Sequence, residues 1–215
     1  NLFFLNFKIL LMNDLFQSLT GMLQGDTVKN MAQKFGVGED VVQKVVAMGL
    51  PMIVGGLNKN VADEKGAESL NKALEQHDGS LLNNLSNAFS SNASNIMQDG
   101  MKILGHVLGG TQQNVQNHIS KGLGVSSEVV GNILSMAAPM VLEFFGQKKK
   151  EQGLDVKGIV NIVQTTTQQA PPKEMSLIEK FLDRNGDGSI LDDVMDISSK
   201  FFGSFFGKKE EYNPF

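Results

Sequence analysis

Apolar residues recur every three or four positions along most of this chain, which is the spacing of one face of an α-helix. The spacing is clear at positions 41, 42, 45 and 46, and again at 129, 130, 133 and 134. No stretch alternates apolar and polar residues for long enough to predict a β-strand. The pattern therefore predicts an all-α fold. We expect helices at 13–24, 26–35, 39–59, 64–76, 79–107 (with a break), 111–122, 126–147, 155–167, 174–182 and 192–206.

One sequence segment occurs twice. Residues 31–53 and 119–141 match without a gap at a constant offset of 88 positions, since 139 − 51 is 88. In each copy a Gly-Val pair precedes the longer helix, and a Met-x-x-Pro-Met sequence lies inside it. Glycine is favoured just past a helix end, so the glycine of each pair is expected to end the shorter helix. Repetition at a fixed offset predicts one helix-turn-helix-like unit used twice, with Pro51 and Pro139 kinking or restarting the longer helices.

The sequence from Asp183 to Asp193 matches the first half of an EF-hand calcium loop. Oxygen-bearing side chains occupy loop positions one, three and five, and glycine occupies position six. The bidentate glutamate expected at position twelve is replaced by Val194, and acidic residues come earlier. We therefore predict a weak calcium site, with a Kd of about 10⁻⁵ to 10⁻³ M. The expected ligands are Asp183, Asn185, Asp187 and the carbonyl of Ser189, with Asp192 or Asp193 closing the shell.

Four phenylalanines follow the loop at positions i, i+1, i+4 and i+5, which places them along one side of a helix. Burying each side chain contributes about 1.5–3 kcal/mol, so all four are unfavourable in water. We expect them to pack on the repeated units or on a second copy of the chain, or to bind a protein partner. These residues are Phe201, Phe202, Phe205 and Phe206.

Composition divides the chain into segments. The first residues are apolar, and the sequence beginning at Met12 resembles a native start, so the extension before it is interpreted as non-native. A Thr/Gln/Pro stretch is typical of a linker. The expected boundaries are 1–11 for the extension, 12–164 for the duplicated all-α domain, 165–173 for the linker, 174–207 for the EF-hand-like hairpin and 208–215 for a charged tail.

The repeated unit also resembles a helix-turn-helix, so a DNA-binding protein is the alternative function. Residues 38–49, at the start of the second helix of the first copy, carry Glu39 and Asp40 against Lys44, and residues 126–135 of the second copy carry Glu128 alone, so each stretch has a charge of −1. The whole chain has a net charge of −4. Because contacts to phosphate supply most non-specific DNA affinity, we expect no nucleic-acid partner.

Enzymatic chemistry has little support in the sequence. His77, His106 and His118 are isolated, and no catalytic motif has the required spacing. The chain contains no cysteine, which excludes a disulfide framework and a cysteine-based zinc site. No run of about twenty apolar residues occurs. We therefore expect a non-enzymatic protein without a transmembrane helix, located in the cytoplasm.

The repeated Gly-Val and Met-x-x-Pro-Met words, the sequence from Ile103 to Gly110, and the calcium loop with its Phe/Gly-rich continuation resemble the YidB-like bacterial proteins of unknown function (domain of unknown function 937). The resemblance covers residues 12–207. It implies an all-α fold and no established activity. The expectation is a non-enzymatic, calcium-binding helical module with a structural or protein-interaction role, whose partner is an unidentified protein or a second copy.

Overall fold

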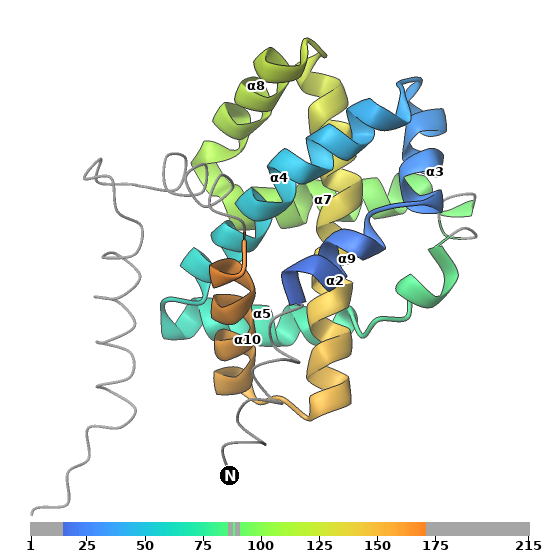
Figure 1. Ribbon diagram of the computed structural model, residues 1–215. Helices are drawn as coiled ribbons and strands as arrows, with labels where there is room; N and C mark the ends of the chain where they lie inside the picture. The colour runs from blue at the N-terminus through green and yellow to red at the C-terminus, as the bar shows by residue number, and fades with distance from the viewer. Residues whose placement is uncertain (1–14, 86–87, 89–90, 171–215) are drawn as a thin grey trace, which may run out of the picture.

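The computed structural model describes residues 15–85, 88 and 91–170, and in this part of the chain every regular element is helical (Figure 1). The all-α prediction is confirmed there. The predicted helices at 174–182 and 192–206 lie outside the described residues, as does the extension at 1–11. The helices are α2 (Leu15–Met22), α3 (Asp26–Phe35), α4 (Glu39–Asn60), α5 (Glu64–Gln76), α7 (Ala93–Leu108), α8 (Gln112–Leu123), α9 (Ser127–Gln152) and α10 (Val156–Gln168), with short 3₁₀ helices η1 (Leu82–Asn84) and η2 (Gly109–Thr111).

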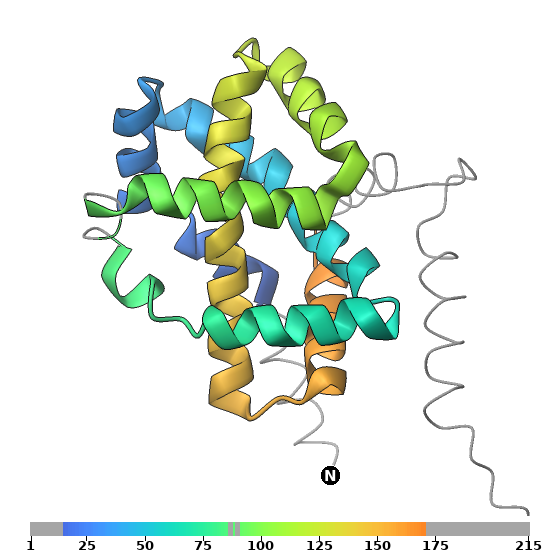
Figure 2. The same ribbon diagram turned by 180° about the vertical axis from the view of Figure 1, so that it is seen from behind.

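Helix α9 lies at the centre of the molecule. Figures 1 and 2 show α4 crossing it on one side and α5 and α7 crossing it on the other. It packs against α3, α4, α5, α7, α8 and α10. Every residue from 133 to 146 in α9 is buried, and so is every residue from 49 to 58 in α4. Helices that are apolar on all sides belong in the interior of a fold, and these two form its core.

The same two helices are long and apolar enough, by length and composition alone, to cross a membrane. In the structure, 67% of the most apolar window of α4 and 83% of that of α9 are buried inside the protein. Core helices share this composition with membrane spans, so burial in the fold accounts for it.

The two copies of the repeated word form turns of the same backbone conformation. Gly36 ends α3 and Gly124 ends α8, both in the left-handed region with φ of 65° and 67°. The next helix then follows an extended residue, Gly38 before α4 and Ser126 before α9, with ψ of 151° and 147°. Glycine adopts the left-handed conformation at little cost, which explains why each shorter helix ends where the sequence predicts. Superposition of residues 31–57 on 119–145 is the measurement that tests the predicted duplication.

Pro51 and Pro139 are buried inside α4 and α9, and neither helix restarts at its proline. A proline in a helix interior costs about 3 kcal/mol. Packing on all sides of these two helices offsets that local cost. The methionines of the repeated word join the same core, as Met52, Met136 and Met140 are buried.

The break predicted within 79–107 is confirmed. Within that range η1 spans Leu82–Asn84, and Asn92 has a non-helical backbone conformation directly before α7, which begins at Ala93. Near the start of the range Gly79 has a φ of +90°, a conformation that glycine adopts far more readily than other residues.

The predicted helix at 155–167 overlaps the start of the predicted linker at 165–173, and the overlapping residues are helical. Residues 165–168 form the last turn of α10, and the side chains of Thr166 and Thr167 are buried. Their hydroxyls donate to the carbonyls of Ile162 at 2.7 Å and Val163 at 2.8 Å. Because these bonds satisfy the polar groups within the helix, the polar sequence does not prevent burial. Residues 171–173 lie outside the described residues.

Candidate functional site

The sequence-predicted sites fall outside the part of the chain that the structure describes, which ends at Ala170. The structure therefore does not place them. Within residues 15–85, 88 and 91–170, no group of three or more His, Cys, Asp and Glu side chains is arranged to hold a metal ion. The undescribed site residues are the calcium ligands Asp183, Asn185, Asp187, Ser189, Asp192 and Asp193, and the phenylalanines Phe201, Phe202, Phe205 and Phe206.

The structure instead reveals a polar cluster built around Glu143 of α9. Glu143 is the only charged residue between Val129 and Gln147 in the sequence, and only 4% of it is exposed. Burying a carboxylate in an apolar interior costs several kcal/mol unless hydrogen-bond donors or an opposite charge surround it. The segment that supplies those donors is therefore fixed against α9 at Glu143.

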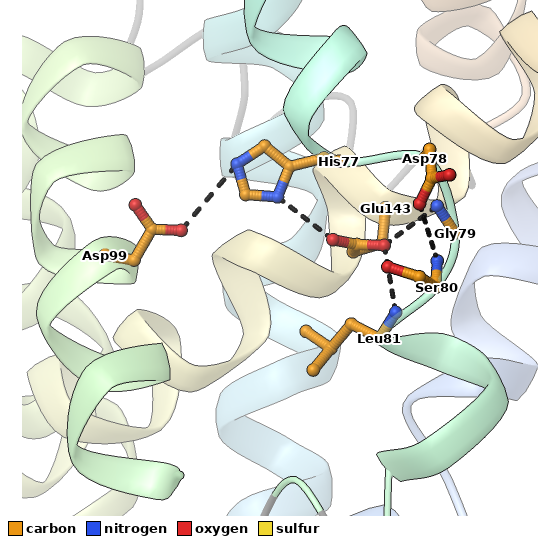
Figure 3. Close-up of polar contacts among 7 residues, drawn as sticks. All are labelled: His77, Asp78, Gly79, Ser80, Leu81, Asp99 and Glu143. Atoms are coloured by element: carbon orange, nitrogen blue, oxygen red, sulfur yellow. Dashed lines mark hydrogen bonds and ion pairs between the residues drawn. The ribbon is translucent and has the colours of Figure 1, made fainter.

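Three donors converge on the Glu143 carboxylate from the segment that follows α5 (Figure 3). His77 Nδ1 lies 3.1 Å from Oε1. The backbone N–H of Gly79 donates to Oε2 at 2.8 Å, and that of Leu81 donates to the same oxygen at 3.3 Å. An ionised carboxylate only accepts, so the Nδ1–H of His77 is the donor in the first contact. Both oxygens of Glu143 are therefore engaged by protein groups.

A close helix contact brings His77 to this position. A Cβ added at Gly146 of α9 would overlap the His77 carbonyl oxygen and lie 3.0 Å from that of Leu74. At Gly79 a Cβ would lie 2.8 Å from the Cβ of Gln147. Two glycines thus let the end of α5 and the following turn approach the backbone of α9, which places the imidazole beside Glu143.

The second nitrogen of His77 faces helix α7. Its Nε2 lies 3.7 Å from Asp99 Oδ2, which is longer than a hydrogen bond. The Asp99 side chain is 48% exposed, whereas that of His77 is 15% exposed. The His77 imidazole therefore lies between two carboxylates, the buried one of Glu143 on α9 and the half-exposed one of Asp99 on α7. Because His77 directly follows α5, these contacts connect three helices.

An open pocket of about 470 Å³ lies over this cluster. His77, Asp99 and Glu143 contribute to its lining together with apolar side chains and uncharged polar ones. The apolar residues are Leu81, Ala88, Ile96 and Pro139, and the uncharged polar residues are Gln76, Ser80, Ser91 and Asn92.

Asp78, next to His77, faces a different partner. Its Oδ2 lies 2.9 Å from Lys150 Nζ, and its Oδ1 accepts from the Ser80 N–H at 3.1 Å. The hydrogen bond from Lys150 is the main cause that lowers the pKa of the Asp78 carboxyl to about 2. Because the pKa is lowered on folding, the pair supports the fold above the ordinary carboxyl pKa of 3.8, and that support is lost as the pH falls towards 2.

The interpretation of His77 as an isolated histidine is wrong. Its partners Glu143 and Asp99 come from distant helices, so no local spacing in the sequence reveals them. One signal was present: a single acidic residue inside a long apolar helix must be either exposed or paired. That signal marks Glu143 as a candidate for a buried polar centre, although it does not identify His77 as its partner.

The helix starts proposed for DNA recognition carry little positive charge. At the exposed start of α4, Lys44 Nζ lies 3.1 Å from Asp40 Oδ2, and its hydrogen bond is the main cause that lowers the pKa of Asp40 below its usual value. The first turn of α9 contains Glu128 as its acidic residue. The lysine charge is therefore shared with a neighbouring carboxylate on the same helix.

Comparison with known proteins places the chain in a family. A family model described as "Bacterial protein of unknown function (DUF937)" matches residues 17–148. No curated protein and no solved structure matches this chain. Because the matched residues make up more than half of the sequence, the chain belongs to this family. The match ends before the predicted calcium loop, and the narrower YidB-like label stays a prediction.

Proposed function

We propose that this DUF937 protein is a non-enzymatic helical module that binds calcium through its C-terminal loop and has a structural or protein-interaction role. The observation that carries the proposal is the spacing of Asp183, Asn185 and Asp187 ahead of a glycine at loop position six. Calcium takes six to eight oxygen ligands, and this order supplies part of that shell around a sharp turn. The weak affinity expected without a bidentate glutamate suits a structural clip better than a cytosolic sensor.

The Glu143 carboxylate has a structural role in this proposal. A general base needs an oxygen or nitrogen within reach of the proton that it removes. Both oxygens of Glu143 instead accept hydrogen bonds from His77, Gly79 and Leu81. A carboxylate occupied in this way fixes the segment after α5 against α9, which is a structural role.

Calcium is expected to raise the melting temperature of the full chain. A ligand that binds only the folded state stabilises it by RT ln(1 + [L]/Kd), about 1.4 kcal/mol at a tenfold excess over Kd. Asp187→Ala should abolish the shift, whereas Asp40→Asn removes an acidic charge outside the loop and should preserve it. Comparing Asp192→Asn with Asp193→Asn identifies the residue that closes the shell. Identical melting curves in millimolar calcium and in chelator would count against the proposal.

DNA binding is the alternative, and the helix-turn-helix-like corners α3–α4 and α8–α9 are the observation behind it. We expect no duplex binding at micromolar protein and about 50 mM salt, where basic proteins bind most readily. The reason is the charge of −1 on residues 38–49, of −1 on residues 126–135 and of −4 on the chain. A gel shift that weakens as salt rises would reverse this preference.

Removing residues 201–215 is expected to cause dye binding or aggregation, because Phe201, Phe202, Phe205 and Phe206 are proposed to cover apolar surface of the domain or of a second copy. A chain that lacks only residues 208–215 keeps the phenylalanines and loses the charged tail, so it is the matched control and should behave as the parent. If the longer truncation stays monomeric, binds no dye and melts as the parent does, the tail does not pack in this way.

A further inference from the structure

In the pocket of about 470 Å³ described above, two hydrogen-bond acceptors lie close enough to share one donor. In the neutral tautomer of His77 whose Nδ1–H donates to Glu143, Nε2 is an acceptor. Asp99 Oδ2, also an acceptor, lies 3.7 Å from it. Two acceptors at this separation cannot bond to each other, but one donor can reach both. A nitrogen atom about 2.9 Å from each satisfies both distances.

The charge and shape of the pocket select the kind of donor. Its described lining includes the carboxylates of Asp99 and Glu143 and no lysine or arginine, so the local field favours a cation. Its volume of about 470 Å³ falls within the usual range of small-molecule sites. Ile96 and Pro139 supply an apolar wall, and Asn92 supplies a further uncharged polar group.

We propose that this pocket binds a small organic cation that carries N–H donors, namely a protonated primary amine with a short apolar chain. The ammonium group bridges His77 Nε2 and Asp99 Oδ2, and its third N–H remains for solvent or an uncharged polar side chain. The apolar chain lies against Ile96 and Pro139. The site is independent of the calcium loop, and neither needs the other.

The test is a titration of the full chain with n-butylammonium chloride, followed by NMR of backbone amides and of the His77 ring nitrogens. We expect saturable binding with a Kd on the order of 1 mM, as a ligand of this size allows. Butyltrimethylammonium has the charge and the chain but no N–H, and 1-butanol has the chain but no charge. Both should bind at least about tenfold more weakly, because each lacks one of the two features that the site recognises.

Asp99→Asn should weaken butylammonium binding at least about tenfold, and thermal melting checks that this half-exposed substitution leaves the fold intact. Asp78→Asn is the matched control, because Asp78 pairs with Lys150 and is not in the pocket lining. Equal binding of 1-butanol, or unchanged binding in Asp99→Asn, would overturn the proposal. A further result would overturn it: NMR shows both ring nitrogens of His77 protonated near neutral pH, and butylammonium shifts the signal of neither nitrogen. In that case Nε2 carries a proton and cannot accept a hydrogen bond from the amine.

Discussion

Glu143→Ala is expected to lower the free energy of unfolding by about 3–5 kcal/mol, because it removes the acceptor from a buried, hydrogen-bonded charged cluster. The substitution leaves His77 Nδ1 and the backbone N–H groups of Gly79 and Leu81 without the partner that they have in the fold. Domains of this kind have total stabilities of about 5–15 kcal/mol, so the loss is a large fraction. For a chain of this length it corresponds to a fall in melting temperature of roughly 6–20 °C.

Two further variants separate the role of Glu143 from the general effect of losing a glutamate. Glu143→Gln keeps the shape and one acceptor oxygen, so its cost should be smaller, about 1–3 kcal/mol. Glu128→Ala removes an exposed glutamate from the same helix and should change stability by no more than about 1 kcal/mol. Chemical denaturation measures all three. If Glu143→Ala unfolds at the same denaturant concentration as Glu128→Ala, the cluster does not hold the segment after α5.

Gly100→Ala and Gly105→Ala are expected to have opposite effects, although both lie in α7. A Cβ at Gly100 would overlap the Ser135 carbonyl oxygen of α9 and lie 3.0 Å from a ring carbon of Pro139. The two helices must then separate, which costs about 1–3 kcal/mol or more. At Gly105 a Cβ meets nothing within 4 Å, so alanine should stabilise the helix by about 0.5–1 kcal/mol.

The opposite signs make this pair a test of the crossing between α7 and α9. Denaturant unfolding of the two variants and the parent measures the effect. Helix propensity alone would make both alanines stabilising, so a difference in sign reports the contact at Gly100. Equal stabilisation by both would show that the backbones do not approach at Gly100. Destabilisation by both would contradict the open surroundings of Gly105.

Local signals in the sequence predicted most of the helices. The predicted bounds 26–35 and 64–76 are those of α3 and α5, and a capping residue marks one end of each helix. Gly36 ends α3 in the left-handed conformation, and the Asp63 side chain accepts from the Gly66 N–H at the start of α5. Each signal acts within one turn of the chain, so it can be read without knowing the fold.

The features that the sequence did not predict depend on contacts between distant segments. Thr166 and Thr167 fall in both the predicted helix and the predicted linker, and their burial was not predicted because they are polar; within α10 their hydroxyls bond to helix carbonyls. His77 reads as isolated because Asp99 and Glu143 reach it only when α7 and α9 pack beside α5. The pocket over His77 forms only when these helices pack together. Sequence patterns could therefore single out Glu143 as an unusual acidic residue, but they could not predict the pocket.

Calcium binding by the loop at 183–193 is tested most directly by isothermal titration of the full chain with calcium chloride, with Asp187→Ala measured in parallel. The ligand pattern predicts one saturable site with a Kd of about 10⁻⁵ to 10⁻³ M and only heats of dilution for the variant. Asp40→Asn, which removes an acidic charge elsewhere, should titrate as the parent does. Heats of dilution alone for the parent, or the same binding curve for the parent and Asp187→Ala, would contradict the proposed function.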